Sequence, residues 1–287
     1  MNDPILKGAL EIQKLCSKSE PFFVGRNGTI ETEVIYFWKS HRPTRTYPDR
    51  MRELIQRNAG IFPSTDESID RWSAEYVQIL SLINGGAAGW YAPTLQIEKI
   101  ILDYHAPNAF RTPLRSLEPY YVAKGNRWTE KLAGKKVAVV SSFAATIEKQ
   151  LSKSAEIWPN GLLDISGVKW SFVRTGYAPV TAMGNATWPS GCNTWEAAVE
   201  YVVREVGKPD IALIGCGGLG MIIAGRLKAK GVSAIVLGGA IQVLFGVKGK
   251  RWETHDIISK FWNDAWVCPS ATEFPAAAYS VEGGCYW

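Results

Sequence analysis

The sequence predicts an α/β fold: a Rossmann-like, mostly parallel sheet with helices on both faces and a helical N-terminal portion. Three observations predict it. From Lys135 onward, short apolar runs alternate with amphipathic stretches, which is the pattern of βα units in a parallel sheet. The runs 137–140 and 211–214 are apolar throughout, as in strands that are covered on both faces. Residues 211–239 read as strand, glycine-rich turn, helix and second strand.

The composition is that of a globular protein with a hydrophobic core. Of the 287 residues, 46% are hydrophobic and 21% are charged, which excludes a disordered chain. We expect a single α/β domain over 1–287. Its N-terminal helical part, 1–132, holds one strand-turn-helix, and its part 133–287 is Rossmann-like.

Charge, cysteine content and hydropathy exclude several classes of protein. A net charge of +5 is too small to indicate a nucleic-acid partner. The five cysteines form no CxxC pair and the three histidines are isolated, so neither a disulfide framework nor a zinc site is indicated. The N-terminus lacks a leader pattern and no apolar run reaches about 20 residues, so we expect no transmembrane segment and a cytoplasmic location. Nothing in the sequence indicates an oligomeric state.

Helical spacing and turn residues predict the elements of the N-terminal part. In chain order these are a helix over 5–15, a strand over 22–24, a turn over 25–28, a helix over 29–39, a loop marked by Pro43 and Pro48, and a helix over 66–84. Ser64 or Thr65 is the expected N-cap of the last helix, and Gly85-Gly86 is its expected stop. The stretch 93–128 is rich in proline and tyrosine, and 95–102 is its most regular piece.

The second part alternates between strands and helices. We expect strands over 137–140, 168–173, 211–214 and 234–237, and helices over 144–151, 194–206 and 219–230.

A glycine-rich turn joins the third of these strands to its helix. Gly215, Gly217, Gly218 and Gly220 satisfy the pattern GxGxxG, directly after a strand and at the start of a helix. There the glycines allow backbone N–H groups to approach a diphosphate, and the helix N-terminus favours negative charge. The alternative is that these glycines only permit close packing of the helix on the sheet.

Two further features indicate which phosphorylated ligand would bind. No acidic residue occurs between Gly231 and Gly249, although a dinucleotide enzyme places one after the next strand to hold the ribose. Gln242, Lys248, Lys250 and Arg251 follow that strand, and we expect them to bind a nucleotide at the same edge of the sheet. The alternative is a solvated basic loop.

At several places the sequence resembles the GT-D-fold glycosyltransferases and related, mostly uncharacterised proteins of polysaccharide gene clusters. The matching pieces are FFVGRNGTIE (22–31), NAGIFP (58–63), VAVVSSF (137–143), LIGCG (213–217), LGG through Trp252 (237–252) and EGGCYW (282–287). They span nearly the whole chain. The resemblance implies a nucleotide-sugar donor, a glycan acceptor and an Mn²⁺ or Mg²⁺ ion held by a DxE motif.

The chain departs from the family at that motif. Aligning Arg26, Gly28 and Glu31 with the family's R-x-G-D-G-E puts Thr29 and Ile30 where Asp and Gly should stand. Glu31 is then the one remaining candidate metal ligand, and a single carboxylate is a poor cage for such an ion.

The same segment supplies the candidate catalytic residues. Glu31 could deprotonate an acceptor hydroxyl, and Arg26 could pair with a phosphate or with Glu31. Gly28, Thr29 and Trp252 are the candidate substrate-binding residues. A purely structural alternative for Glu31 is a first-turn residue favoured by the helix dipole.

The function predicted first is therefore a glycosyltransferase of polysaccharide biosynthesis that uses a nucleotide sugar. Two alternatives stay open: an NAD(P)-dependent oxidoreductase, supported by GxGxxG alone, and a non-catalytic protein of this fold that binds a nucleotide or glycan.

Overall fold

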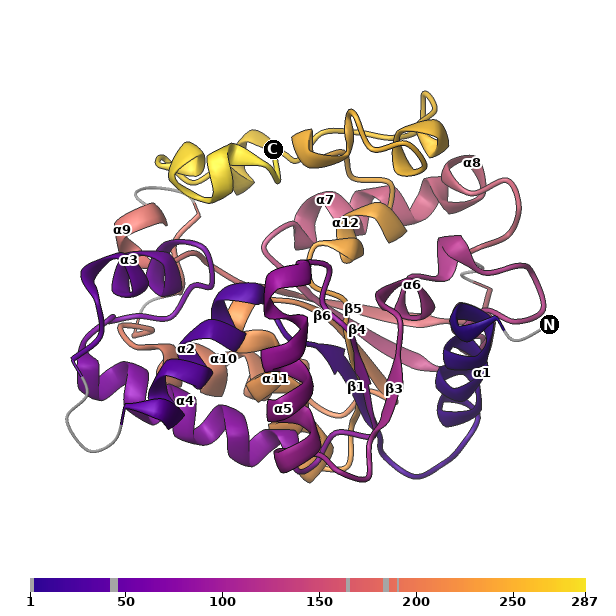
Figure 1. Cartoon of the computed structure of the whole chain (residues 1–287). Helices are drawn as coiled ribbons and strands as arrows, with labels where there is room; N and C mark the ends of the chain where they lie inside the picture. Colours follow the sequence, from indigo (N-terminus) through magenta and orange to yellow (C-terminus); the bar gives the residue numbers. More distant parts are fainter. Residues whose placement is uncertain (1–2, 42–45, 164–165, 183–185, 190) are drawn as a thin grey trace.

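The chain forms a seven-stranded sheet with helices on both faces (Figure 1). The computed structural model describes residues 3–41, 46–163, 166–182, 186–189 and 191–287. The strands are β1 (Phe23–Arg26), β2 (Gly85–Ala87), β3 (Phe110–Thr112), β4 (Lys136–Ser141), β5 (Lys169–Arg174), β6 (Ile211–Gly215) and β7 (Ser233–Val236). They pair in the order β3-β2-β1-β7-β6-β4-β5, and every pair is parallel. The predicted Rossmann-like α/β fold is confirmed.

Successive residues of the central strands point to opposite faces of the sheet, and each face has its own core. In β4, Ala138 and Val140 belong to one core cluster, and Val137 and Val139 belong to the other. This alternation is the period of two that a strand imposes. Since both faces are buried, 137–140 in β4 and 211–214 in β6 are apolar at every position, as the sequence predicted.

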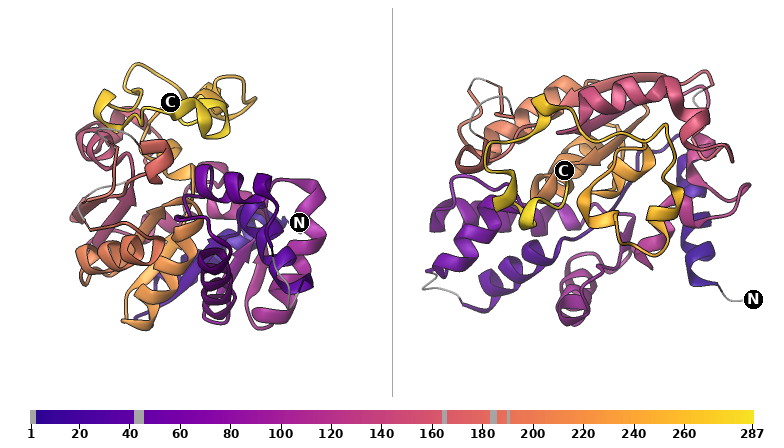
Figure 2. Two further views of the ribbon diagram at one scale, coloured as in Figure 1. Left: turned by 90° about the vertical axis from the view of Figure 1, so that its left-hand side faces the viewer. Right: turned by 90° about the horizontal axis from the view of Figure 1, so that it is seen from above.

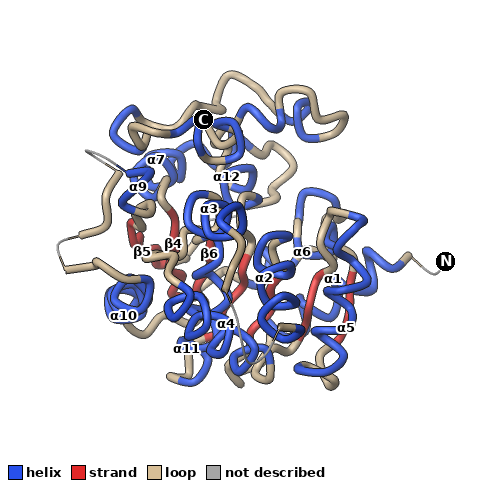
Figure 3. Tube along the Cα trace, turned by 60° about the vertical axis from the view of Figure 1, so that its left-hand side comes forward, coloured by secondary structure: helices blue, strands red, loops and turns tan. Residues whose placement is uncertain are grey.

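Helices divide between the two faces (Figure 3). One face is covered by α2 (Thr29–Ser40), α4 (Asp66–Leu80), α5 (Leu95–His105), α10 (Trp195–Val206) and α11 (Gly220–Ala229), with α3 (Asp49–Arg57) packed on α2. The other face is covered by α1 (Pro4–Cys16), α6 (Leu114–Leu117), α7 (Ala144–Gln150), α8 (Ser154–Ile157) and α12 (Ala240–Leu244). The short α9 (Pro179–Ala182) lies beside the C-terminal segment. Among the helices in the described ranges, none is both long and apolar enough to cross a membrane.

One expectation for the N-terminal part was wrong. The glycines expected to end the helix over 66–84 lie in β2; the helix ends at Leu80, and Thr65 caps its start. Glycine is required there because a Cβ on Gly85 would lie 2.1 Å from Cζ of Phe110 in β3. Pro48, expected in a loop, is the N-cap of α3, a helix that was not among the predicted elements and whose one buried residue is Ile55. Pro43 lies outside the described residues.

β1 joins the two parts of the chain into one sheet. It pairs with β2 on one side and with β7 on the other, where Phe23 faces Ala234 and Val24 faces Ile235. Turns at the carboxyl ends of strands from both parts therefore lie at the same edge of the sheet.

The segment 268–287 crosses above this edge (Figure 2). Glu273 fixes it, since its buried carboxylate accepts hydrogen bonds from the N–H groups of Ala145 (3.0 Å) and Thr146 (3.1 Å) at the start of α7. The Thr146 hydroxyl and the N–H of Ser270 (3.2 Å) donate to its other oxygen. Trp287 Nε1 donates to the Glu273 carbonyl (3.4 Å).

Candidate functional site

A pocket of about 380 Å³ lies at the carboxyl ends of the strands, under the segment 268–287. Its lining includes residues that end or follow β1, β4, β5, β6 and β7, together with Val281, Glu282 and Tyr286. β4 connects outward to β5, whereas β6 connects to β7 on its other side. This reversal is the topological switch point at which open α/β sheets bind ligands.

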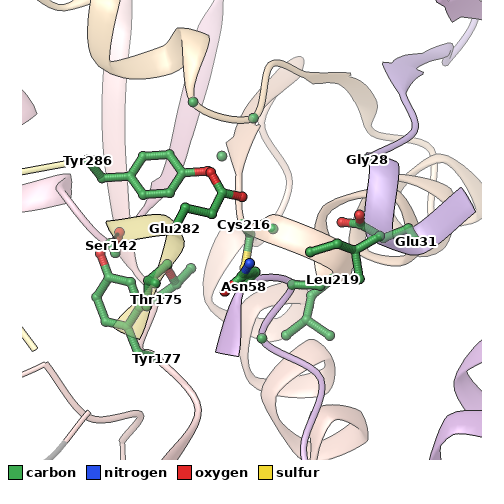
Figure 4. Close-up of a pocket in the computed structure, with 18 of the residues that line it drawn as sticks. Gly28, Glu31, Asn58, Ser142, Thr175, Tyr177, Cys216, Leu219, Glu282 and Tyr286 are labelled. Atoms are coloured by element: carbon green, nitrogen blue, oxygen red, sulfur yellow. Dashed lines mark hydrogen bonds between the residues drawn. The ribbon is translucent and has the colours of Figure 1, made fainter. Parts of the chain in front are cut away.

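The β1–α2 turn brings Arg26, Gly28, Thr29 and Glu31 to the pocket. Glu31 is only 8% exposed and folds back over Gly28, where a Cβ would lie 1.9 Å from its Oε2. Burial raises the pKa of Glu31, and Glu282 raises it further; a hydrogen bond from its own backbone and the charge of Arg26 oppose the shift. A carboxyl group with a raised pKa is suited to accept and release a proton. Figure 4 shows Glu31 on the opposite side of the pocket from Glu282 and Tyr286.

A buried polar network that the sequence did not reveal holds this turn. Glu98 on α5 accepts hydrogen bonds from Asn27 Nδ2 (3.3 Å) and from the N–H of Gly89 (2.8 Å). Tyr76 donates its hydroxyl proton to Asn27 Oδ1 (2.8 Å). Burial raises the pKa of Glu98, which the hydrogen bonds from Gly89 and Asn27 oppose. The residue before Gly28 is thus fixed by two helices, α4 and α5.

Arginines supply the positive charge of the pocket, which is lined by Arg26, Arg57 and Arg251. Arg26 lies against the turn after β7, since a Cβ on Gly238 (φ 58°) would be 2.6 Å from its Nη2. Arg251 stacks on the Tyr286 ring, 4.5 Å from the centroid, and pairs with Glu282.

The predicted basic loop is divided by the fold. Gln242 and Arg251 line the pocket, and Gln242 Nε2 donates to the Tyr286 carbonyl (2.9 Å). Lys248 and Lys250 do not line it: the Lys248 ammonium lies 5.4 Å from the Trp262 ring centroid, and Lys250 is exposed. Trp252 is 7% exposed and also lies outside the pocket lining, in the core cluster beneath. Of the loop residues predicted to bind the ligand, the pocket lining therefore includes Gln242 and Arg251 only.

The glycine turn after β6 packs against the segment that contains Ala59 and also lines the pocket. Gly215 and Gly217 line the pocket, but the N–H of Gly218 donates to the Ala59 carbonyl (2.8 Å). A Cβ on Gly217 would lie 2.7 Å from that carbonyl oxygen, and one on Gly220 would lie 3.1 Å from Val236 Cγ1. A Cβ on Gly215 would likewise lie 2.6 Å from Ile241 Cγ2. Close packing therefore accounts for all four glycines, and of the four only Gly215 and Gly217 also line the pocket.

Hydroxyl groups line the far side of the pocket, after β4 and β5. Tyr177 donates its hydroxyl proton to Ser142 Oγ (2.8 Å). Desolvation raises the pKa of the neighbouring Cys216 to about 12, opposed by a hydrogen bond with Thr175. The thiol therefore stays protonated and is not a nucleophile.

The residues present do not fit the divalent cation that the family resemblance implies. Among the described residues, no group of three His, Cys, Asp or Glu side chains is placed to hold a metal ion. Glu31, the one acid left from the DxE motif, is buried against Gly28 and its carboxylate experiences the charge of Arg26. A hard cation is held by several oxygen ligands, and here one carboxylate is offered.

Comparisons with known proteins gave a remote resemblance in fold. No protein-family model matches the sequence, and no curated protein matches it. Among solved structures, a match is titled "Selenomethionine substituted structure of domain of unknown function 1792 (DUF1792)". It is 12% identical, with a TM-score of 0.37, and the alignment covers 92% of this chain and 96% of that one.

Proposed function

We propose that the chain is a glycosyltransferase that moves a sugar from a nucleotide-sugar donor to a hydroxyl of a glycan acceptor. The observation that carries the proposal is a buried carboxyl group with a raised pKa, Glu31, in the same pocket as Arg26 and Arg251. Glycosyl transfer needs these two things: a base for the acceptor hydroxyl, and positive charge for the departing diphosphate.

The donor would bind along the turns after β6 and β7. Its diphosphate would lie at Gly215 and Gly217, with the guanidinium groups of Arg26 and Arg251 neutralising it. As the acceptor oxygen bonds to the anomeric carbon, the bond between that carbon and the phosphate oxygen breaks. Glu31 takes the acceptor proton, and the nucleoside diphosphate leaves with the bonding electrons. The arginines supply the charge stabilisation without a metal ion.

The oxidoreductase alternative has less support. A dinucleotide fingerprint uses the N–H groups of the glycine turn for the pyrophosphate, but the N–H of Gly218 is bonded to Ala59. β7 is followed by Leu237 and two glycines, so it offers no acid to a ribose.

A thermal-shift panel tests the proposal: UDP-, GDP- and TDP-sugars and NAD, each with Mn²⁺ and with EDTA. A bound donor should raise the melting temperature in EDTA as well, since ligand stabilisation follows occupancy. A panel in which no nucleotide sugar has an effect, or in which only NAD has one, would overturn the proposal.

Neighbouring residues give a matched pair of variants. Arg251→Ala removes a pocket guanidinium, whereas Lys250→Ala removes an exposed charge next to it. A charged hydrogen bond contributes about 1.5–3 kcal/mol, so we expect Arg251→Ala to weaken donor binding roughly 10- to 150-fold. Lys250→Ala should leave it nearly unchanged; equal effects of both would remove the role of Arg251. If Glu31→Gln loses turnover but still binds the donor, the protein is an enzyme that uses Glu31 and not a binding protein without catalytic activity.

A further inference from the structure

Two aromatic side chains line the pocket and remain largely in solvent. Trp90 is 67% exposed and Tyr91 is 40% exposed. Their ring centroids are 5.7 Å apart in an edge-to-face arrangement. By contrast, Trp252, the aromatic residue among the candidate substrate-binding residues from the sequence, is buried in the core. Adjacent exposed apolar side chains at a groove are a feature of ligand-binding sites.

The strand order places these rings on one side of Glu31. Trp90 and Tyr91 follow β2, Glu31 follows β1, and the glycine turns follow β7 and β6, in the order β2-β1-β7-β6. Neighbouring strands are about 4.8 Å apart, so the span from β2 to β6 is roughly 14 Å. In the order of the strands, the turn that carries Glu31 thus lies between the loop that carries the rings and the turns at which the proposed diphosphate would bind.

Hydrogen bonds connect the loop that carries Trp90 and Tyr91 to the turn that carries Glu31. Glu98 bonds the N–H of Gly89, the residue before Trp90, through one oxygen, and Asn27 through the other. The N–H of Ala88 donates to the Thr112 carbonyl (2.9 Å). The buried carboxylate of Glu98 therefore fixes the backbone just before the rings relative to the turn that carries Glu31. A ligand that stacks on the rings would meet a preformed surface.

We propose that Trp90 and Tyr91 form the acceptor subsite, which binds the apolar face of a pyranose ring. This inference rests on the proposed function. A pyranose presents C–H groups on one face and hydroxyls at its edge, so stacking on an aromatic ring leaves a hydroxyl free to reach Glu31. The nucleobase of the donor would lie on the other side of Glu31, at the β6 and β7 turns.

Saturation-transfer NMR with a panel of methyl hexopyranosides tests the subsite, and thermal shifts with UDP, GDP and TDP report separately on the nucleotide. The variants are Trp90→Ala and Trp90→Phe, with Tyr104→Ala as a control because Tyr104 is 74% exposed and lies outside the pocket lining. We expect glycoside binding about five- to tenfold weaker in Trp90→Ala. It should be near wild type in Trp90→Phe and Tyr104→Ala, with nucleotide shifts unchanged in all three.

The outcomes separate this inference from the proposed function. Loss of the nucleotide shift in Trp90→Ala, with glycoside signals kept, would make the rings a platform for the base and overturn the acceptor subsite alone. Absence of glycoside binding in the wild type would also overturn it. Glycoside binding that depends on Trp90, in a protein that no nucleotide stabilises, would support the sugar subsite and refute the transferase.

Discussion

The carboxylate of Glu273 offers a direct test of how the C-terminal segment is held over the pocket. The substitution Glu273→Gln keeps one acceptor oxygen but replaces Oε2 with an amide nitrogen, which cannot accept from the Thr146 hydroxyl. The N–H of Ser270 keeps a partner, because it also donates to Thr146 Oγ1 (3.0 Å). One buried donor is left unsatisfied, so the free energy of unfolding should fall by about 1–3 kcal/mol.

Urea unfolding followed by tryptophan fluorescence measures this change. Glu253→Gln is the matched control, since Glu253 is exposed and such substitutions usually change stability by less than about 0.5 kcal/mol. Because the same segment supplies Glu282 and Tyr286 to the pocket, the Gln variant should also show a smaller thermal shift with a donor. If both variants unfold at the wild-type midpoint, the carboxylate does not anchor the segment and the reasoning is refuted.

Two further substitutions test the pocket itself. Burial raises the pKa of Glu31, so the charged carboxylate destabilises the folded state as pH rises through that pKa. Glu31→Gln should therefore melt at a higher temperature than the wild type at pH 8 and at about the same temperature at pH 4. Calorimetry at both pH values measures the two melting temperatures, and a variant less stable than the wild type at pH 8 would contradict the raised pKa of Glu31. Gly217→Ala should cost about 1–2 kcal/mol more than Gly231→Ala, because both glycines have positive φ but only Gly217 would place a Cβ against Ala59. Equal denaturant midpoints for the two variants would show that the backbone at Ala59 moves away from the added Cβ at no cost in stability.

The sequence predicted those strands and helix ends whose signal lies in a few neighbouring residues. β4, β6 and β7 were found because buried parallel strands are apolar at each position, and the Thr65 cap was found because capping is a short-range hydrogen bond. β2 escaped prediction because a strand with two glycines is defined by its neighbours β1 and β3, not by its own side chains.

The site was predictable in the same limited way. Arg26 and Glu31 belong to one strand-turn-helix, so their common place at the sheet edge follows from the sequence. The hydrogen bond from Gly218 to Ala59 depends on how distant segments pack, and no local pattern encodes it. The exposed position of Trp90 and the buried position of Trp252 likewise depend on the tertiary fold, since neither lies in a long helix or strand whose period would predict its burial.

The pairing of β1 with β7 also determines when the pocket can form during synthesis. β1 is made near the start of the chain, but one of its two partners is the last strand to be made. Such a non-local pairing folds slowly and leaves a strand edge unprotected until the partner arrives. Glu31 therefore cannot meet the turn after β7 until that strand has been made, so a nascent chain that ends before β7 carries the proposed base without the complete site.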